Sequence, residues 1–460
     1  MIPFIDVLDR ADSGSICELK EWDMKIISTK VKEKLKEYGL KNTCSPENTI
    51  NSDDGLADSF WKAGFDLAVD TGMYCMTTKR IIKFSDLELR DCLKNNPREI
   101  YRGRDLDRRL MKRRLPEDRE MIYNWIGPFG NPVSEDLYVP ITQSAIQYRI
   151  IDAVMPPCLE TVYGRPLKSG TPYETIGGKL EAILQREAAR RAQRPGIPIW
   201  GGATSPTEYG NFGGYGVPGG GDPQTELNAA LATSELKTDY GLLQKIAHFL
   251  NCGSFVHSGH WSMIGGFPGP PEGAALVAIA AAILQVPVHQ AITMSTGCFD
   301  LRYNGNCGRE SIWSQSITWQ AISRNTHLLL VGLINPVAGP CTNMILQEAA
   351  VNAINCAVSG CAVAIGIRSA GGRLRDYVTG LESKFTGEVC KTSCGMKRVD
   401  GNEVAKKLIQ KYEGQLSSPP KGKPFTDCFD MKTLRPTEEW LKIYDNVWKE
   451  LESLGVARQY

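Results

Sequence analysis

From about residue 121 onward, short apolar segments alternate with longer segments of helical periodicity, and this rhythm restricts the fold more than any other feature. The apolar segments are rich in branched side chains and show no regular polar alternation, which is typical of parallel strands buried on both faces. Seven of them occur, starting near residues 121, 158, 197, 253, 290, 327 and 362. The helical segments between them span residues 172–193, 241–250, 272–285, 309–323 and 342–360.

This alternation predicts an α/β fold built as a (β/α)8 TIM barrel, with an N-terminal helical segment and C-terminal helices. The similar spacing of the strands favours a closed eight-stranded barrel over an open doubly wound sheet, although the sequence does not place the eighth strand. No GxGxxG follows the first strand, so a dinucleotide-binding fold is not supported. We expect residues 1–120 to form a helical segment packed on the barrel, and residues 121–460 to form the barrel with a C-terminal helical extension.

The first 120 residues are charged, and residues 24–40 and 58–74 have helical periodicity. Residues 101–120 are basic with interleaved acids, which is typical of a solvated helix face. The alternative for this segment is a docking surface for an acidic partner protein.

The composition excludes several classes of protein. The formal net charge is +1, so no long-range field favours a nucleic acid or a membrane surface. No apolar run reaches the length of a transmembrane helix, and the first residues lack the basic and apolar regions of a signal peptide, so we expect a cytoplasmic protein. The 14 cysteines are dispersed without a CxxC pair, and Cys390 and Cys394 come closest. This pattern predicts buried reduced thiols rather than a disulfide framework.

In a TIM barrel the active site lies at the carboxyl ends of the strands. Trp200 ends one predicted strand and precedes two glycines that leave the face of its ring open. This favours a place at the barrel mouth; the alternative is a plug of the barrel core. Polar, charged or aromatic residues also end the other strands: Glu160, Tyr163, His257, Ser258, His260, Ser295, Thr296, Asn335 and Arg368.

Two of the five histidines, His257 and His260, share the segment FVHSGHW at a predicted strand end. We interpret them as polar residues that line the substrate pocket. A metal site is the alternative, with Asp300 as a further ligand, although Cys252 lies at the wrong end of the strand to join it. Residues 209–223 are rich in glycine with interspersed aromatics, which indicates either a mobile surface loop or a lid over the barrel mouth.

Short sequence blocks in a fixed order connect the chain to a known family. The weaker blocks are KAGF (62–65), YC (74–75), GRD (103–105), PVSED (132–136), ELKTD (235–239), IAH (246–248) and RE (309–310). The stronger blocks are AGPCT (338–342), TGLE (379–382), GEV (387–389), GK (422–423), PTEE (436–439) and YD (444–445). Over nearly the whole chain the sequence resembles the monomethylamine:corrinoid methyltransferases of methanogenic archaea and related anaerobes. The resemblance implies an oligomeric (β/α)8 barrel that passes a methyl group from an amine to the cobalt of a separate corrinoid protein.

The departures from the family pattern fall in the substrate pocket. Trp200 stands where the usual members carry pyrrolysine, whose electrophilic imine is thought to capture the amine. An acid, a glutamine and a tyrosine of the family are replaced at Gly259, Leu333 and Asn335. A further acid would fall near Glu226 or Ala229, where the spacing has changed, and the sequence leaves that position open. The resemblance therefore implies a retained scaffold with a rebuilt pocket, which argues against monomethylamine as the methyl donor.

A quaternary ammonium compound needs no covalent activation, and an indole face attracts a methylated cation by roughly 0.5–2 kcal/mol. We therefore predict a methyltransferase that moves a methyl group from a methylated amine, a quaternary ammonium compound rather than monomethylamine, to the Co(I) of a separate corrinoid protein. The predicted catalytic residues are Trp200, His257, His260 and Asn335. The predicted substrate-binding residues are the aromatics Tyr163 and Trp261, which complete a cation cage, and Arg302 and Arg368, either of which would hold a substrate carboxylate.

Two other functions stay open. One is an O- or S-demethylating methyltransferase on the same barrel, with a metal or a general acid at His257 or His260, and the other is a non-catalytic paralogue. We expect no tightly bound corrinoid, because the chain lacks a DxHxxG-type motif and His248 and His289 have no such context. No metal site is assigned. The expected partners are a corrinoid protein, a small methylated substrate and further copies of the chain.

Overall fold

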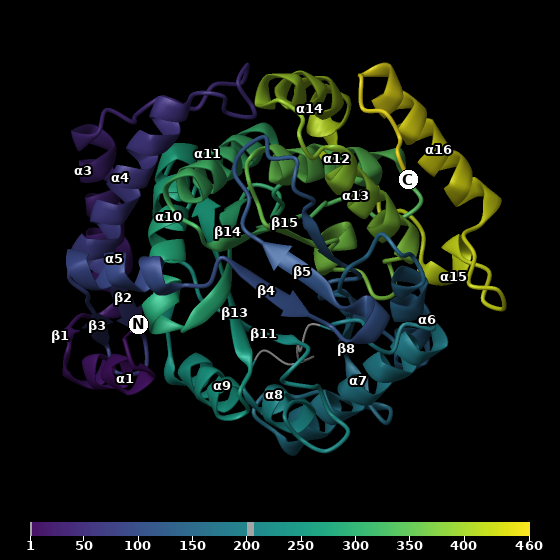
Figure 1. The fold of residues 1–460 in the computed structure, drawn as a ribbon, viewed down its shortest axis with the longest axis horizontal. Helices are drawn as coiled ribbons and strands as arrows, with labels where there is room; N and C mark the ends of the chain where they lie inside the picture. Colours follow the sequence, from purple (N-terminus) through teal and green to yellow (C-terminus); the bar gives the residue numbers. More distant parts are fainter. Residues whose placement is uncertain (1, 200–206) are drawn as a thin grey trace.

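Six parallel strands form the central sheet of the computed structural model, which describes residues 2–199 and 207–460. The neighbours in the sheet are, in order, β11 (Leu227–Leu231), β13 (Phe255–Ile264), β14 (Ala291–Asp300), β15 (Leu329–Leu333), β16 (Val363–Gly366) and β6 (Tyr123–Ile126). In Figure 1 the strands lie around the centre of the view, and the helices form an outer ring. The predicted α/β class and the parallel alternation are confirmed.

Two parallel bridges continue this order beyond β6. Trp125 pairs with Ala153, and Val154 pairs with Ile199, so eight segments of the chain follow one another with parallel pairing. The sheet is curled, because residues from distant strands, such as Trp125 of β6 and Leu227 of β11, belong to one cluster on its concave side. This concave side is called the interior below.

The prediction that residues 158–164 form the second strand of the barrel is wrong. The segment that continues the sheet lies earlier, at Ala153–Val154, and ends before Pro156 and Pro157, which cannot donate hydrogen bonds to a ladder. Residues 158–164 instead contain two short strands, β8 (Cys158–Leu159) and β9 (Thr161–Val162), which pair with β7 (Pro132–Val133) and β10 (Arg165–Pro166). The strand that the sequence does not place is β11.

Helices cover the convex side of the sheet. They are α6 (Glu135–Ile146), α7 (Pro172–Arg191), α9 (Tyr240–Asn251), α10 (Pro271–Val288), α11 (Arg309–Asn325), α12 (Asn343–Val358) and α13 (Gly380–Thr392). α10 is long and apolar enough to cross a membrane, contrary to the expectation from the sequence, but 94% of it is buried inside the protein. It packs between the sheet and the N-terminal helix α4 (Asp54–Thr71), and is a core helix.

The N-terminal part packs outside α10 and α11. It comprises α1 (Phe4–Ser13), α3 (Ser28–Glu37), α4, α5 (Asp86–Asn95) and a small sheet of β1 (Ser15–Ile16), β3 (Arg80–Ile82), β2 (Met73–Cys75) and β12 (Lys237–Thr238). Gly64 lets α4 approach α10, because a Cβ atom there would lie 2.5 Å from Cγ2 of Ile279. The C-terminal helices α14 (Arg398–Tyr412) and α16 (Glu438–Ser453) pack on α12 on another side of the ring, with α15 (Phe425–Cys428) near α16 (Figure 1).

The helical interpretation of residues 101–120 is wrong, because this segment contributes to an antiparallel hairpin. β4 (Glu99–Arg102) and β5 (Arg109–Lys112) pair, and they cross the centre of the ring in Figure 1. Ile100 and Met111 face each other across the hairpin and are buried with Leu329 and Val363 of the sheet. The hairpin therefore closes the interior where the strands begin.

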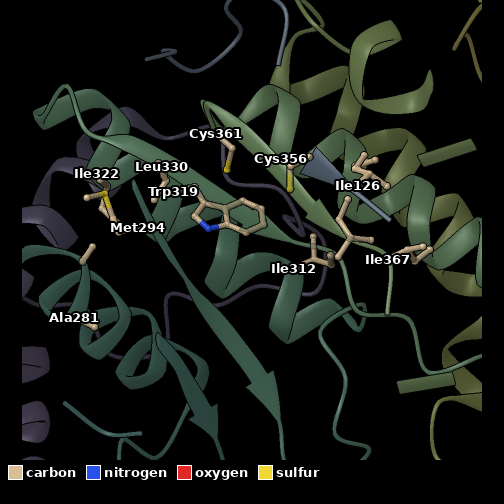
Figure 2. Packing of buried hydrophobic residues seen from close by; sticks show 14 of the residues in the cluster. Ile126, Ala281, Met294, Ile312, Trp319, Ile322, Leu330, Cys356, Cys361 and Ile367 are labelled. Atoms are coloured by element: carbon tan, nitrogen blue, oxygen red, sulfur yellow. The ribbon is translucent and has the colours of Figure 1, made fainter. Parts of the chain in front are cut away.

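The core between sheet and helices contains large apolar side chains and thiols. Figure 2 shows Trp319 of α11 among Leu330, Cys356 and Cys361. The Trp319 indole donates a hydrogen bond to the Thr296 carbonyl at 2.7 Å, which fixes α11 on β14. All fourteen cysteines are unpaired and most are buried, so the prediction of buried thiols is confirmed.

Candidate active site

The odd-numbered residues of the sheet face the interior, in β14 from Thr293 onward, after a register shift that follows Ala291. Leu227, Trp125, Phe299 and Leu333 cluster there, whereas the even-numbered Val256 and Leu330 belong to the outer core. Alternation along a strand then places His257, Gly259 and Trp261 of β13 inside, beside Thr293 and Ser295 of β14. This parity sorts the predicted site residues into those that share the interior and those that do not.

His257 is buried inside, midway along β13 rather than in a loop after it. Its Nδ1 atom hydrogen-bonds the Thr293 hydroxyl at 2.8 Å, and Nε2 hydrogen-bonds the Ser295 hydroxyl at 3.2 Å. The Trp125 ring packs edge-on, with 5.7 Å between ring centroids. Burial lowers the pKa of His257 to about 3, because the charged imidazolium is poorly solvated there. The imidazole is therefore neutral at physiological pH.

His260 points to the other side of the sheet. Its Nε2 atom accepts a hydrogen bond from the Leu236 backbone N–H at 3.1 Å, and burial lowers its pKa to about 3. The carboxyl of Glu235 lies 4.0 Å away and accepts hydrogen bonds from the Ser262 hydroxyl and the Met263 N–H. Burial raises the pKa of Glu235 to about 7. The structure thus does not bring His260 and His257 together, because three residues along a strand separate opposite faces.

Gly259 and Trp261 shape the interior next to His257. A Cβ atom on Gly259 would lie 2.8 Å from both Ser295 Oγ and Trp261 Cη2, and 2.9 Å from Leu231 Cδ2. The Trp261 ring therefore occupies the space beside residue 259, and packs edge-on against Phe299 at 6.2 Å between ring centroids. Its Nε1 atom is buried without a hydrogen-bond partner among the described residues. An aromatic ring thus lies beside Gly259, a position where we expect a departure from the family pattern.

Asn335 follows β15 at the carboxyl end of the strands and is fully buried. Its backbone N–H donates to Asn306 Oδ1 at 3.0 Å, and Ile334 before it extends the ladder to Ile365 of β16. Neither the oxygen nor the nitrogen of the Asn335 amide has a partner among the described residues. A buried amide with both atoms unsatisfied is costly unless a ligand or water supplies the hydrogen bonds.

The two predicted carboxylate-binding arginines differ. Arg302 lies on the surface with its side chain 63% exposed, and is paired with Asp300 and Glu310, which raise the pKa of its guanidinium. Its charge is already neutralised, so its predicted role in substrate binding is not supported by this geometry. Arg368 is largely buried, its pKa is lowered by burial, and its guanidinium has no hydrogen bond or ion pair to any residue in the described part of the chain.

Of the remaining predicted residues, one lies apart from the interior and one lies outside the residues that the structure describes. Tyr163 is 65% exposed at the turn between β9 and β10, where its backbone N–H donates to Glu135. Trp200 lies outside the described residues, directly after Ile199 in the sequence. Of the two residues near the position that the sequence left open, Ala229 faces the interior opposite His257, whereas Glu226 is ion-paired with Arg186.

Other strand-end residues also prove to be structural. Ser258 bonds His289 on the outer side at 2.8 Å, and the Thr296 hydroxyl donates to the Ala278 carbonyl. Glu160 pairs with Arg375 at the surface. Part of the glycine-rich segment is a helix, α8 (Tyr209–Gly214), packed on α7, whereas the sequence predicted a loop or a lid over all of residues 209–223.

The metal site considered from the sequence is not assembled from the described residues. His257 and His260 lie on opposite faces of β13, and Cys252 lies 3.9 Å from His248 at the end of α9. Within residues 2–199 and 207–460, no three His, Cys, Asp or Glu side chains converge as a metal site would require.

The interior also contains residues that the sequence did not single out. Trp125, Phe129, Met155, Met263 and Phe299 pack there with Trp261. Alternate residues of a strand face the same side, so following this alternation to the last residue of each strand would have identified Trp125 and Phe299 as interior residues. The interior is therefore strongly aromatic where the strands end.

The blocks of family resemblance hold the scaffold. Thr379 and Glu382 of the TGLE block form a capping box on α13, and Glu382 also accepts a hydrogen bond from Ser369 next to Arg368. Trp440, just after PTEE, donates to Thr379 at 3.1 Å. Burial raises the pKa of Glu382 to about 7. These blocks thus fix the loop that carries Arg368, whereas Gly259 and Leu333, two predicted departures from the family pattern, face the interior.

Comparison with known proteins finds similarity over nearly the whole chain. The family model for the monomethylamine methyltransferase MtmB matches residues 2–456. The monomethylamine methyltransferases MtmB3 of Methanosarcina barkeri and MtmB1 of Methanosarcina acetivorans are 32% and 31% identical, over 98% of this chain and 98% of each relative. The crystal structure of the Methanosarcina barkeri monomethylamine methyltransferase superposes with a TM-score of 0.95 at 31% identity, covering 98% of both chains. The crystal structure of a hydroxylamine complex of MtmB gives the same values.

Proposed function

The chain belongs to the monomethylamine methyltransferase family and is a methyltransferase, and from this membership we propose that it transfers a methyl group from a quaternary ammonium compound to the Co(I) of a separate corrinoid protein. The barrel mouth is the proposed site, and monomethylamine is not the proposed donor. The corrinoid is the methyl acceptor and arrives with its own protein, so the chain itself needs no resident cofactor in this scheme.

The observation that carries the proposal is the chemistry of the interior. None of the described odd-numbered residues on β6, β11, β13, β14, β15 and β16 is acidic. A donor amine that must be protonated, deprotonated or captured there finds a neutral His257 and aromatic rings instead. A permanently charged ammonium needs neither proton transfer nor covalent capture, and aromatic faces such as that of Trp261 stabilise it by cation–π attraction.

The residues contribute alignment rather than acid–base chemistry. A methyl group on a quaternary nitrogen already has a neutral amine as its leaving group, so the barrier falls when donor and acceptor are held in line. Trp200 is the proposed face against which the cation rests, with Trp261 as a second aromatic side chain in the interior. His257, locked between two hydroxyls, keeps its neutral form and gives the pocket wall a fixed shape.

We also propose that the sheet closes into a barrel between the segment that ends at Ile199 and β11, which are the two ends of the eight-segment order. Pro198, one residue before the bridge at Ile199, and Leu227 of β11 line one small cavity together with Arg102 and Met111 of the hairpin. The two ends of the eight-segment order therefore approach each other. A homo-oligomer in the cytoplasm is the proposed setting.

The O- or S-demethylating alternative is less well supported. A general acid works best with a pKa near the operating pH, whereas the pKa values of His257 and His260 are both lowered to about 3. A transfer assay distinguishes an active methyltransferase from a non-catalytic paralogue. A cognate corrinoid protein reduced to Co(I) is mixed with the chain and a panel of N-, S- and O-methyl compounds, and loss of the Co(I) absorbance is followed. Transfer from quaternary amines supports the proposal; transfer only from ethers or thiols, or from none, contradicts it.

A further inference from the structure

Arg368 is a charged side chain without a counter-charge. The guanidinium is largely buried, and within the described residues no acceptor bonds it. Two other buried arginines show how this fold normally treats such a group. Arg194 bonds Asp107 and the Ile151 carbonyl at 2.8 Å each, and Arg114 bonds the Ala357 and Cys361 carbonyls at 3.0 and 2.9 Å. Arg368 is different because its setting leaves all its donors available.

The backbone around Arg368 is shaped to make room for it. Gly372 has a φ of +68°, and a Cβ atom there would lie 2.7 Å from the guanidinium carbon of Arg368. Gly130, with a φ of +60°, lies on another side, and a Cβ atom there would be 3.8 Å from Nε of Arg368. Two glycines from different loops therefore admit the guanidinium, which a side chain at Gly372 would displace.

The loop that carries Arg368 is held in place. The Ala370 N–H donates to the Ala338 carbonyl at 2.8 Å, and the Gly371 N–H donates to the Pro336 carbonyl at 2.9 Å. The Ser369 hydroxyl donates to Glu382 at 2.9 Å. Ala370 also has a φ of +51°, a conformation that costs energy for a residue with a Cβ atom. A strained but anchored loop next to a free cation is typical of a binding site.

Asn335 lies next to this arginine in the sheet. The Arg368 N–H donates to the carbonyl of Ile334 at 3.4 Å, so residues 335 and 368 come from adjacent strand ends. Both side-chain amide atoms of Asn335 are buried and unpartnered among the described residues. Two neighbouring strand ends thus offer a guanidinium and an amide that no residue in the described part of the chain satisfies.

We propose that Arg368 and Asn335 form a carboxylate subsite, so that the methyl donor is a zwitterion with a quaternary ammonium group and a carboxylate, of the betaine class. This inference rests on the proposed function for the methyl-transfer step. A guanidinium offers two parallel N–H donors that match the two oxygens of a carboxylate, and an amide N–H adds a third. One free arginine balances one negative charge, and the aromatic interior serves the ammonium group.

The transfer is balanced in atoms and electrons. The C–N bond of the donor breaks and its electron pair stays on nitrogen, so the product is a tertiary amine that still carries the carboxylate. Co(I) of the corrinoid protein supplies the electron pair of the new bond to the methyl carbon and becomes Co(III). The subsite takes no part in the bond changes; it orients the donor.

The test compares trimethylglycine with tetramethylammonium as ligands in isothermal titration calorimetry of the full chain. The wild type is expected to bind trimethylglycine about 10- to 100-fold more tightly, the range for charge-assisted hydrogen bonds. Arg368→Met should reduce this preference to near unity and leave the affinity for tetramethylammonium within about two-fold. Arg368→Lys keeps the positive charge but loses the two parallel N–H donors, so its preference for trimethylglycine should lie between those of the wild type and Arg368→Met. Asn335→Ala should reduce the preference several-fold.

Arg375→Met is the matched control, because Arg375 lies seven residues further on but is exposed and paired with Glu160. It should keep the full preference. Equal binding of both ligands by the wild type, or loss of both ligands together in Arg368→Met and Arg368→Lys, would overturn the subsite. Arg368-dependent binding of trimethylglycine without methyl transfer would leave the subsite standing and refute the proposed function. Transfer from tetramethylammonium with no preference for the zwitterion would support the proposed function and refute the subsite.

Discussion

Replacement of Gly259 by alanine tests whether the Trp261 ring fills the space beside residue 259. The new Cβ atom would lie 2.8 Å from Ser295 Oγ, 2.8 Å from Trp261 Cη2 and 2.9 Å from Leu231 Cδ2. These three atoms belong to three residues on three strands, so no single side-chain rotation relieves all of them. Extra volume in such a packed place costs about 1–3 kcal/mol.

This cost converts into a measurable shift. With an unfolding entropy of about 2.1 cal/mol/K per residue, the 460-residue chain loses roughly 1 °C of melting temperature per kcal/mol, so Gly259→Ala should melt about 1–3 °C below the wild type. Differential scanning calorimetry resolves this difference. Gly414→Ala is the control, because no atom lies within 4 Å of a Cβ at that position. The control should melt at or slightly above the wild-type temperature.

A double-mutant cycle assigns the cost to the ring. Trp261→Phe removes the Cη2 atom, so Gly259→Ala should destabilise the Trp261→Phe protein less than it destabilises the wild type. If Gly259→Ala melts with the wild type, or costs the same in both backgrounds, the Trp261 ring does not fill the space at residue 259, and the reasoning about a rebuilt pocket fails.

Three further predictions concern other groups. Trp200→Phe should weaken binding of a quaternary amine modestly and Trp200→Ala severely, with melting temperatures unchanged; a drop of the size expected for losing a buried aromatic, about 3–5 kcal/mol, would instead mark Trp200 as a core plug. Because the pKa of His257 falls from its ordinary 6.5 to about 3 on folding, the free energy of unfolding should decrease as pH falls from about 6.5 to 3, and His257→Gln should lose up to about 1.4 kcal/mol per pH unit of this dependence; identical pH profiles would contradict the neutral buried form. The pKa of Glu348, which accepts hydrogen bonds from the Val337 and Ala338 N–H groups, rises from 4.5 to about 8, so wild-type stability should fall as pH rises from about 4.5 to 8, and Glu348→Gln should remove that decline in urea titrations; a decline that persists in the variant would refute it.

The sequence predicted the strands that are continuous apolar runs and failed where a strand is short. β11, with the sequence LNAAL, and the segment at Ala153–Val154 contribute few residues, and tertiary pairing rather than local pattern defines them. The β4–β5 hairpin was missed because its outward side is dominated by charged residues, namely Glu99, Arg109 and Lys112. Its inward pair, Ile100 and Met111, is too small a signal to reveal a strand.

The site residues divide in a similar way. Asn335 and Arg368 were selected from the sequence because strand ends predict a place at the mouth of a barrel, and in the structure both follow the end of a strand. His257 and His260 were assigned to one pocket because β13 was ended too early; continued to Ile264, its alternation separates the two side chains. Arg302 was predicted to bind a substrate carboxylate because its pairing with Asp300 and Glu310 depends on the path of the loop, which the sequence does not show. The lack of a partner for Arg368 among the described residues is likewise visible only in three dimensions.

The most direct test of the central claim is the ratio of two initial rates of methyl transfer. The chain is mixed with its corrinoid protein in the Co(I) form, and the loss of Co(I) absorbance is followed with a quaternary ammonium donor and, separately, with monomethylamine at equal concentration. A Trp200→Ala protein serves as the control for the site. We predict transfer from the quaternary donor that depends on Trp200, and no transfer from monomethylamine above the background without enzyme. Transfer from monomethylamine at an equal or higher rate would contradict the account of a pocket rebuilt for a donor that needs no activation.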